Sequence, residues 1–167
     1  MWRRISKKFK DNPKREKVAK KLLELGLRIS EDEKIYCKDV EISYTAIAKA
    51  TDVDRRTVKA TVKELLNDKE LSKIFRNIIP AGFLLKNLVK DLNLGLIEIE
   101  ANADNPGILA EAAKILASEN ISIRQAYAED PKIEGNPKLT IITEIPIPGK
   151  LFRKFLDING VKRVTIC

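Results

Sequence analysis

The chain has 167 residues, 44% of them hydrophobic and 34% charged, and its 32 Lys and Arg against 24 Asp and Glu give a net charge of +8. This composition excludes a disordered chain, and the length allows two small domains or one of average size. No apolar run approaches the roughly 20 residues that cross a bilayer, and no apolar signal segment follows the basic N-terminus, so we expect a cytoplasmic location and no membrane partner.

Residue types that carry catalysis or bind metals are scarce. The chain has two cysteines, Cys37 and Cys167, and no histidine. A zinc site, a Ser-His-Asp triad and a Cys-His pair are therefore excluded or nearly so, and we predict no metal and no cofactor. Glu98 and Glu100 share one face of a predicted strand, but no nucleophile, base or ligand set accompanies them, so we predict that the chain is not an enzyme.

Charge divides the chain into two parts. Residues 1–90 hold 23 Lys and Arg against 13 Asp and Glu, a net charge of +10, whereas residues 91–167 hold 9 against 11, a net charge of −2. Such an asymmetry indicates two domains with different partners. We expect a polyanion for the first domain and a small molecule for the second.

The first eleven residues predict a short basic helix. Its apolar residues, Trp2, Ile5 and Phe9, lie on one helical face among arginines and lysines. Such a helix could pack on the domain behind it, touch a membrane surface or contact phosphates, and we favour packing because three apolar residues make a weak anchor. Asp11 and Asn12 followed by Pro13 then resemble a cap and a proline at a helix start, which predicts a helix over residues 14–25.

Two helical patterns follow, over residues 44–50 and 54–66, after an acidic turn at residues 31–33 and a short strand at 35–37. Only three residues separate the two helices, so the chain must turn sharply between them, as in a helix-turn-helix. Asp54 is a suitable N-cap for the second helix. Its apolar residues recur on one helical face and predict its buried side: Val58, Val62, Leu65 and Leu66.

The stretch over residues 47–58 resembles the helix-turn-helix of bacterial and archaeal transcriptional regulators. Its small Ala48, its turn residue Val53 and its capping Asp54 match that motif. Asp52 departs from it, because many such turns have glycine there. Aspartate tolerates a left-handed backbone better than most residues, so the turn is still expected.

The resemblance implies that the N-terminal part of the second helix enters the major groove of DNA. Arginine can contact guanine O6 and N7 with two hydrogen bonds, whereas lysine more often contacts phosphate. Alternatively, these charges only keep an exposed helix soluble, or the helices dock to a protein. The candidate DNA-binding residues are Arg55, Arg56, Lys59 and Lys63.

Residues 67–94 are too apolar for a flexible tether. A first group of apolar residues predicts a helix that ends at Pro80: Leu71, Ile74, Phe75, Ile78 and Ile79. A second group predicts another helix: Phe83, Leu84, Leu88 and Leu92. We expect this segment to pack on one of the domains or on a second subunit.

The last part of the chain predicts the element order strand, helix, strand, strand, helix, strand, which is the ferredoxin-like arrangement. The strands are expected over residues 96–101, 121–127, 138–145 and 161–166, with helices after residue 106 and over 149–157. Pro106 suits the first helical position, where Asp104 or Asn105 before it could cap the free amides.

Residues 94–167 resemble the ACT domain family of regulatory modules. They carry that family's Asp-x-Pro-Gly turn as residues 104–107, and Asn120-Ile121 stand where the family turns from its first helix into its second strand. The resemblance implies a domain that pairs through strand edges or helices and binds an amino acid or related metabolite. The implied ligand-binding residues are Asp104, Asn105, Gly107 and Ile108, with Asn120 and Ile121 of a partner chain.

We therefore expect an α+β chain with a helix-turn-helix domain over residues 1–66, winged or not. A helical linker over 67–94 and a ferredoxin-like βαββαβ ACT-like domain over 95–167 follow it. The combination resembles two-domain prokaryotic regulators, and we expect an archaeal source. The predicted function is a homodimeric or larger regulator of amino-acid metabolism that binds DNA and senses an amino acid. Alternatively, the ACT-like domain only oligomerises, and the first half docks to a metabolic enzyme.

Overall fold

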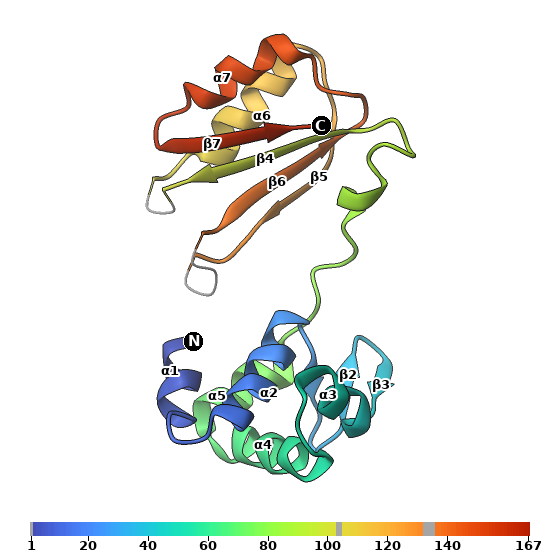
Figure 1. The fold of residues 1–167 in the computed structure, drawn as a ribbon, viewed down its shortest axis with the longest axis vertical. Helices are drawn as coiled ribbons and strands as arrows, with labels where there is room; N and C mark the ends of the chain where they lie inside the picture. Colours follow the sequence, from blue (N-terminus) through green and yellow to red (C-terminus); the bar gives the residue numbers. More distant parts are fainter. Residues whose placement is uncertain (1, 103–104, 132–135) are drawn as a thin grey trace. The chain divides into compact units, whose positions relative to one another are not determined.

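The computed structural model describes residues 2–102, 105–131 and 136–167, and the chain divides into two compact units, Met1–Gly82 and Phe83–Cys167 (Figure 1). The first unit is mainly helical, and the second is a sheet with helices, which confirms the predicted α+β class. Counted over these units, Lys and Arg exceed Asp and Glu by 21 to 13 in the first and equal them at 11 each in the second. The first unit therefore carries the whole net charge.

The first unit consists of five helices and a small antiparallel sheet of order β1-β2-β3. Its elements in chain order are α1 (Trp2–Lys8), α2 (Pro13–Glu24), β1 (Arg28–Ile29), β2 (Ile35–Cys37), β3 (Val40–Ile42), α3 (Tyr44–Thr51), α4 (Arg55–Asn67) and α5 (Lys69–Asn77). The sheet stands between α2 and α3 in the chain. Only β2 was predicted from the sequence, because two- and three-residue strands are too short to show a period.

The N-terminal helices form as the sequence predicts. Ile5 and Phe9 are at most 1% exposed, so α1 packs on its own unit, which confirms packing over the alternatives. The side chain of Asn12 accepts a hydrogen bond from the Arg15 amide at 3.2 Å, and Pro13 follows at the start of α2. This cap and the proline together define where α2 begins.

Helices α3 and α4 form the expected helix-turn-helix. Asp52 ends α3 in the left-handed region, with φ 53° and ψ 50°, so aspartate takes the backbone conformation that glycine often supplies. Helix α4 packs on α2, α3 and α5, and Val58, Val62 and Leu65 are fully buried while Leu66 is half-buried. The predicted apolar face is therefore confirmed.

Two buried threonines complete this core. Thr51 and Thr61 are both fully buried, although Thr61 occupies a position that often carries a larger apolar residue. Each hydroxyl donates to the carbonyl four residues earlier, at 2.7 Å for Thr51 to Ile47 and 2.8 Å for Thr61 to Thr57. Because these hydrogen bonds satisfy the hydroxyls, threonine can be buried here at little cost.

The segment after α4 differs from the prediction in its second half. Helix α5 forms as expected, with Leu71 and Phe75 fully buried. The second predicted helix is wrong: only a short 3₁₀ turn, η1 (Leu85–Leu88), forms there. The four apolar residues that suggested a helix are exposed by 42–77%: Phe83, Leu84, Leu88 and Leu92.

The second unit has the ferredoxin-like βαββαβ order. Its elements are β4 (Gly95–Ala101), α6 (Ile108–Ser118), β5 (Ile123–Ala128), β6 (Lys138–Thr143), η2 (Gly149–Leu151), α7 (Phe152–Leu156) and β7 (Val161–Ile166). All neighbouring strands are antiparallel in the order β5-β6-β4-β7, which leaves β5 and β7 at the edges. The four strands and two helices were all predicted, since each is long enough to show its period.

Helices α6 and α7 cover one face of this sheet (Figure 1). The core between them contains Ile97, Ile99 and Ile141 from the strands and Leu116 and Phe155 from the helices, all at most 1% exposed. In α6, however, Leu109 is 46% exposed, although it fitted the predicted apolar spacing. It lines a hollow beside the turn before α6.

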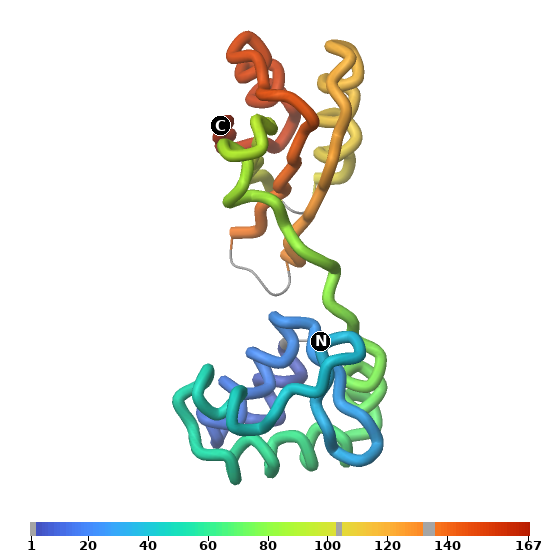
Figure 2. Tube along the Cα trace, turned by 90° about the vertical axis from the view of Figure 1, so that its right-hand side faces the viewer, coloured from blue at the N-terminus to red at the C-terminus, as the bar shows by residue number. Residues whose placement is uncertain are grey.

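The segment that precedes β4 lies on the opposite face. Val89 and Leu94 pack there against Leu96 and Ile142 of the sheet. Figure 2 shows this part of the chain in green beside the strands of the same unit. Gln125 of β5 binds the start of this segment through its side chain. The side-chain oxygen accepts from the backbone N–H of Leu85 at 2.9 Å, and the side-chain nitrogen donates to the backbone carbonyl of Phe83 at 3.0 Å.

Candidate functional site

The exposed side of α4 is the candidate nucleic-acid interface. Asp54 caps the helix by accepting from the Thr57 amide at 2.8 Å and from the Thr57 hydroxyl at 2.6 Å. The Thr57 side chain and then its backbone amide lower the pKa of Asp54, so the carboxylate is stabilised in its charged form. The cap's contribution is therefore present above the ordinary pKa of aspartate and is lost as the pH falls through the lowered folded-state pKa.

All four predicted DNA-binding residues are exposed on α4. Arg55, Arg56 and Lys59 have no ion-pair partner within residues 2–102, 105–131 and 136–167. Lys63 differs, because its ammonium lies 3.8 Å from the carboxylate of Glu33. The start of α4 thus presents three exposed cations that form no ion pair within 4.0 Å among the residues described.

Several other cations that flank these helices are paired. Arg4 and Lys8 of α1 contact Asp68, at 4.0 and 3.3 Å, and Arg76 of α5 contacts Glu31 at 2.8 Å. These pairs join elements of the first unit to one another. The cations at the start of α4 differ from these in having no ion-pair partner among the residues described, a property that they share with other exposed cations of the unit such as Lys69 and Lys73.

The turn before α6 differs from the prediction in its capping. Pro106 does not begin the helix; Gly107, with φ 96°, stands at the N-cap, and no side chain among the described residues, from which Asp104 is excluded, caps α6. The backbone N–H of Asn105 instead donates to the backbone carbonyl of Asn102 at 3.0 Å. The backbone N–H of Asn102 donates to the backbone carbonyl of Gly160 at 2.9 Å. These bonds join the turn to the loop before β7.

Asn105 and Gly160 are in close contact. A Cβ atom added at Gly160 would overlap the side-chain amide of Asn105, and Gly160 also has a φ of 86°. Glycine at residue 160 therefore leaves the space that the Asn105 side chain fills. At Gly107, by contrast, an added Cβ would meet nothing within 4 Å.

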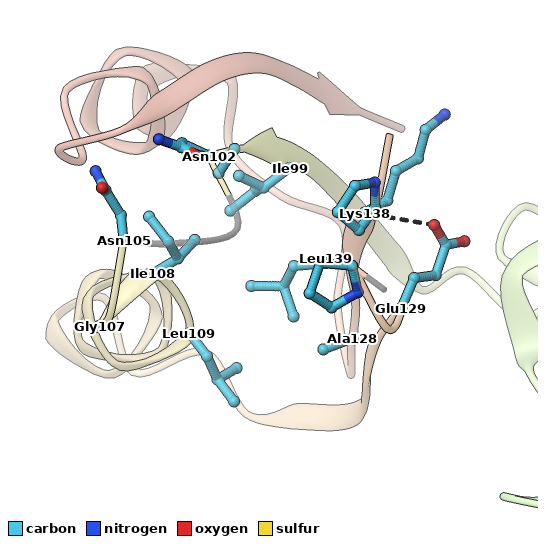
Figure 3. Close-up of a pocket in the computed structure, with 13 residues that line it drawn as sticks. Ile99, Asn102, Asn105, Gly107, Ile108, Leu109, Ala128, Glu129, Lys138 and Leu139 are labelled. Carbon is cyan, nitrogen blue, oxygen red and sulfur yellow. Dashed lines mark hydrogen bonds between the residues drawn. The ribbon is translucent and has the colours of Figure 1, made fainter. Parts of the chain in front are cut away.

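A hollow of about 270 Å³ opens beside this turn. It lies between the ends of β4 and β5, the start of β6 and the first turn of α6, and Figure 3 shows Ile99, Ile108 and Leu139 pointing into it. Most of its lining is apolar. Asn102, Asn105 and Glu129 also line it, and the Glu129 carboxylate accepts from the Lys138 backbone amide at 2.9 Å. The Asn105 side-chain amide itself lies against Gly160 and points away from Ile99 and Leu139 (Figure 3).

The predicted ligand-binding residues are only partly brought together. Asn105, Gly107 and Ile108 line the hollow, and Asp104 lies outside the described residues. Asn120 and Ile121 were expected from a partner chain, which the structure does not contain; within the same chain they lie at the other end of α6, roughly 16 Å away at 1.5 Å per residue. There they end the helix: Asn120 has a φ of 55°, and the Ile121 amide donates to the Leu116 carbonyl at 3.0 Å.

The sequence did not reveal the residues that β5 and β6 contribute to the hollow. Lys138 and Leu139 belonged only to a predicted strand, and Ala128 and Glu129 carried no motif. Their place depends on strand pairing between distant segments, which no local pattern reports. Glu98 and Glu100 have structural partners, since they lie 2.6 Å from Lys86 and 3.4 Å from Lys138, respectively.

Metal-binding clusters and membrane-spanning helices are absent from the described residues. No three or more Cys, Asp or Glu side chains there are grouped so that they could hold a metal ion. Of the helices described, none is long and apolar enough to cross a bilayer.

Comparisons with known proteins show only remote likeness. No protein-family model matches the chain, and no curated protein is significantly similar to it. Solved structures that match include an AsnC-family transcriptional regulatory protein from Pyrococcus furiosus, at 16% identity over 78% of this chain and 80% of that one, with a TM-score of 0.27. AsnC from E. coli matches at 12% identity over 90% and 88%, also with a TM-score of 0.27.

A third match is a transcriptional regulator from Neisseria meningitidis in complex with L-Met. Its identity is 11% over 93% of this chain and 87% of that one, and its TM-score is 0.28. With identities and TM-scores this low, we assign no family. The functional proposal therefore rests on the chain's own residues.

Proposed function

We propose that the chain is a transcriptional regulator of amino-acid metabolism, which binds DNA through α4 and senses an amino acid or related metabolite in the second unit. The single observation that carries the proposal is the group of three exposed cations, Arg55, Arg56 and Lys59. They lie on the first turns of the second helix of a helix-turn-helix, and none has an ion-pair partner among the residues described.

The chemistry of these cations supports DNA as the partner. Unpaired lysines and arginines release counterions when they neutralise phosphates, and arginine can also read guanine in the major groove. The N-terminal residues of the second helix are those that enter the groove in this motif. Since the first unit carries the whole net charge of +8, it is also the unit that a polyanion attracts.

Gel-shift selection of bound genomic fragments, with and without candidate amino acids, tests the proposal. We expect specific fragments to be retained and their retention to change with an amino acid present. Binding through several phosphates should weaken steeply between about 50 and 200 mM salt. Docking to a metabolic enzyme, the alternative function, would instead give no retained duplex and a contact that salt changes little.

The hollow beside α6 is the proposed metabolite site. Its volume of about 270 Å³ and its apolar lining suit one small molecule with an apolar side chain. The N–H groups at the start of α6, which no side chain among the described residues caps, would favour the carboxylate end of such a ligand.

A thermal-shift screen of the twenty amino acids at millimolar concentration checks this site. We expect an apolar amino acid to raise the Tm of the second unit by several degrees, since roughly 1 kcal/mol of binding shifts Tm by about 4–8 °C in a domain of this size. Leu109→Gln, at the hollow, should reduce the shift, whereas Ile145→Gln, equally exposed elsewhere, should keep it. No shift with any amino acid would contradict the ligand class.

A homodimer or larger homo-oligomer is part of the proposal, because two recognition helices would read two half-sites. The edge strand β7 carries exposed Lys162 and Arg163, whose charges discourage pairing with another strand. On the other edge strand, β5, the one cation is Arg124, and its charge is paired with Glu144 at 3.5 Å. Ile123 and Tyr127 of β5 are 37% and 43% exposed. We therefore propose that β5 pairs with β5 of a second copy.

Light scattering tests the dimer. We expect a particle of at least twice the chain mass of 18.9 kDa, and we expect Tyr127→Lys on β5 to lower the mass towards that of one chain. A single-chain mass for the unsubstituted protein at micromolar concentration would contradict the oligomer. An unchanged oligomer with Tyr127→Lys would contradict β5 as its interface.

A further inference from the structure

The acidic turn at residues 31–33 faces the proposed DNA-reading helix. Glu33 lies 3.8 Å from Lys63 of α4, and Arg55 and Lys59 of the same helix line a hollow of about 300 Å³ together with Glu33 and Glu41. A carboxylate at this position competes with phosphates for the cations of α4. It is therefore an unexpected neighbour for a surface that binds a polyanion.

Backbone hydrogen bonds help to hold the turn in place. The Ser30 amide donates to the Lys34 carbonyl at 2.9 Å, and the Glu33 amide donates to the Ser30 carbonyl at 3.2 Å. Glu33 itself has a φ of 66°, which turns the chain back towards the helices. The backbone therefore fixes where the Glu33 side chain begins.

Tyr44, the first residue of α3, joins this turn to the helix-turn-helix. Its hydroxyl donates to the Glu33 carbonyl, and burial together with the charge of Glu33 raises the pKa of Tyr44, so the phenol stays protonated and keeps donating. The Glu33 carboxylate is thus held beside α4 by an element that belongs to the same motif.

We propose that Glu33 is a positioning residue for DNA binding, which holds Lys63 away from the phosphates. In the free protein, Lys63 is the one candidate reading residue with an ion-pair partner among those described. The DNA contacts of α4 are thereby confined to Arg55, Arg56 and Lys59. The affinity of the protein for DNA of arbitrary sequence is therefore lower than it would be if all four cations of α4 contacted the DNA. This inference rests on the proposed function of α4.

Glu31, in the same turn, provides a charge-matched control for Glu33. Glu31 and Glu33 carry the same charge two residues apart, but Glu31 contacts Arg76 of α5 at 2.8 Å rather than a residue of α4. Glu33→Gln and Glu31→Gln therefore change the net charge equally. Only Glu33→Gln releases Lys63.

The test is a fluorescence-anisotropy titration of a duplex of arbitrary sequence at several salt concentrations. We expect Glu33→Gln to tighten binding about two- to fivefold, the range for an exposed ion pair, and to steepen the salt slope by about 0.9, one added phosphate contact. Glu31→Gln should leave the slope unchanged. Adding Lys63→Ala to Glu33→Gln should remove the extra slope.

Other outcomes separate this inference from the proposed function. Equal effects of Glu31→Gln and Glu33→Gln would overturn the role of Glu33, because they would reflect net charge alone. An unchanged slope with Glu33→Gln, while the unsubstituted protein binds, would overturn it as well. No duplex binding by either protein at low salt would overturn the proposed function, and with it this inference.

Discussion

Replacing Arg55 and Arg56 together by alanine is expected to weaken duplex binding by about 30-fold or more. Each arginine that contacts a base edge contributes about 1–3 kcal/mol, and about 1.4 kcal/mol corresponds to a factor of ten. Both side chains are exposed at the start of α4, where no other protein group uses their charge as an ion-pair partner among the residues described. Anisotropy titrations with a selected fragment and an unrelated duplex would measure the loss.

The matched control removes two cations from the neighbouring helix. Lys69 and Lys73 of α5 are exposed, so Lys69→Ala with Lys73→Ala changes the net charge by the same amount. We expect this control to lose less affinity and to keep the preference for the selected fragment. If both pairs of substitutions weaken binding equally, then net charge alone attracts the duplex and α4 is not the reading helix.

Neither pair should change the fold of the first unit. The four side chains are exposed, and the buried face of α4 consists of other residues, namely Val58, Thr61, Val62 and Leu65. Circular dichroism and Tm should therefore match those of the unsubstituted protein. A large loss of Tm with Arg55→Ala and Arg56→Ala would mean that these residues hold the unit together, which is contrary to their exposure.

The second large effect is expected at Gly160. Alanine there should destabilise the second unit by about 2–4 kcal/mol, because a left-handed backbone costs an alanine about 1–2 kcal/mol and the new Cβ must also displace Asn105. Urea unfolding of the full chain, followed by a probe in the second unit, measures the change. The expected Tm loss is several degrees per kcal/mol.

Gly107 and Asn105 separate the two causes. Gly107 has a φ of 96°, but an added Cβ there would meet open space. Gly107→Ala should therefore lower the free energy of unfolding only by the cost of the left-handed backbone. In the double variant Asn105→Ala with Gly160→Ala, the side-chain amide that the new Cβ would displace is gone. The loss of stability should therefore be smaller than the sum of the losses in the two single variants. Equal losses for Gly107→Ala and Gly160→Ala would contradict the contact between Asn105 and Gly160.

The same substitution also bears on the metabolite site. Asn105 lines the hollow, so displacing it with Gly160→Ala should reduce the Tm shift that an apolar amino acid produces. Gly107→Ala leaves Asn105 in place and should keep more of that shift. A full shift in both variants would place the ligand elsewhere in the chain.

Local patterns were sufficient for much of this protein. Period, caps and turn residues are carried by neighbours in the chain, so they specified α2 with its Asn12 cap, α4 with its buried valines, and the strands and helices of the second unit. The same period places Arg56 away from that buried face, whereas Arg55 stands three and seven residues before Val58 and Val62 and is exposed at the first position of α4. It failed for residues 83–92, where apolar spacing suggested a helix.

Residues 83–92 show why spacing alone was not enough there. Leu85 and Val89 are held on the sheet by contacts with Leu96 and Ile142, and Gln125 takes the hydrogen bonds of Phe83 and Leu85. Several of these partners lie far along the chain. Because these contacts hold Leu85, Val89 and the backbone of Phe83 and Leu85 without a helix, they override the helical pattern.

The sequence by itself determined the order of most of the longer elements, the two-part charge and the cations of α4, since each depends on residues that are near one another in the chain. Only the tertiary structure decided that Glu33 lies beside Lys63, that Asn105 fills the space at Gly160, and that Leu139 lines the hollow. Each of these contacts joins segments that are far apart in the chain, and no local period records which distant segments will meet.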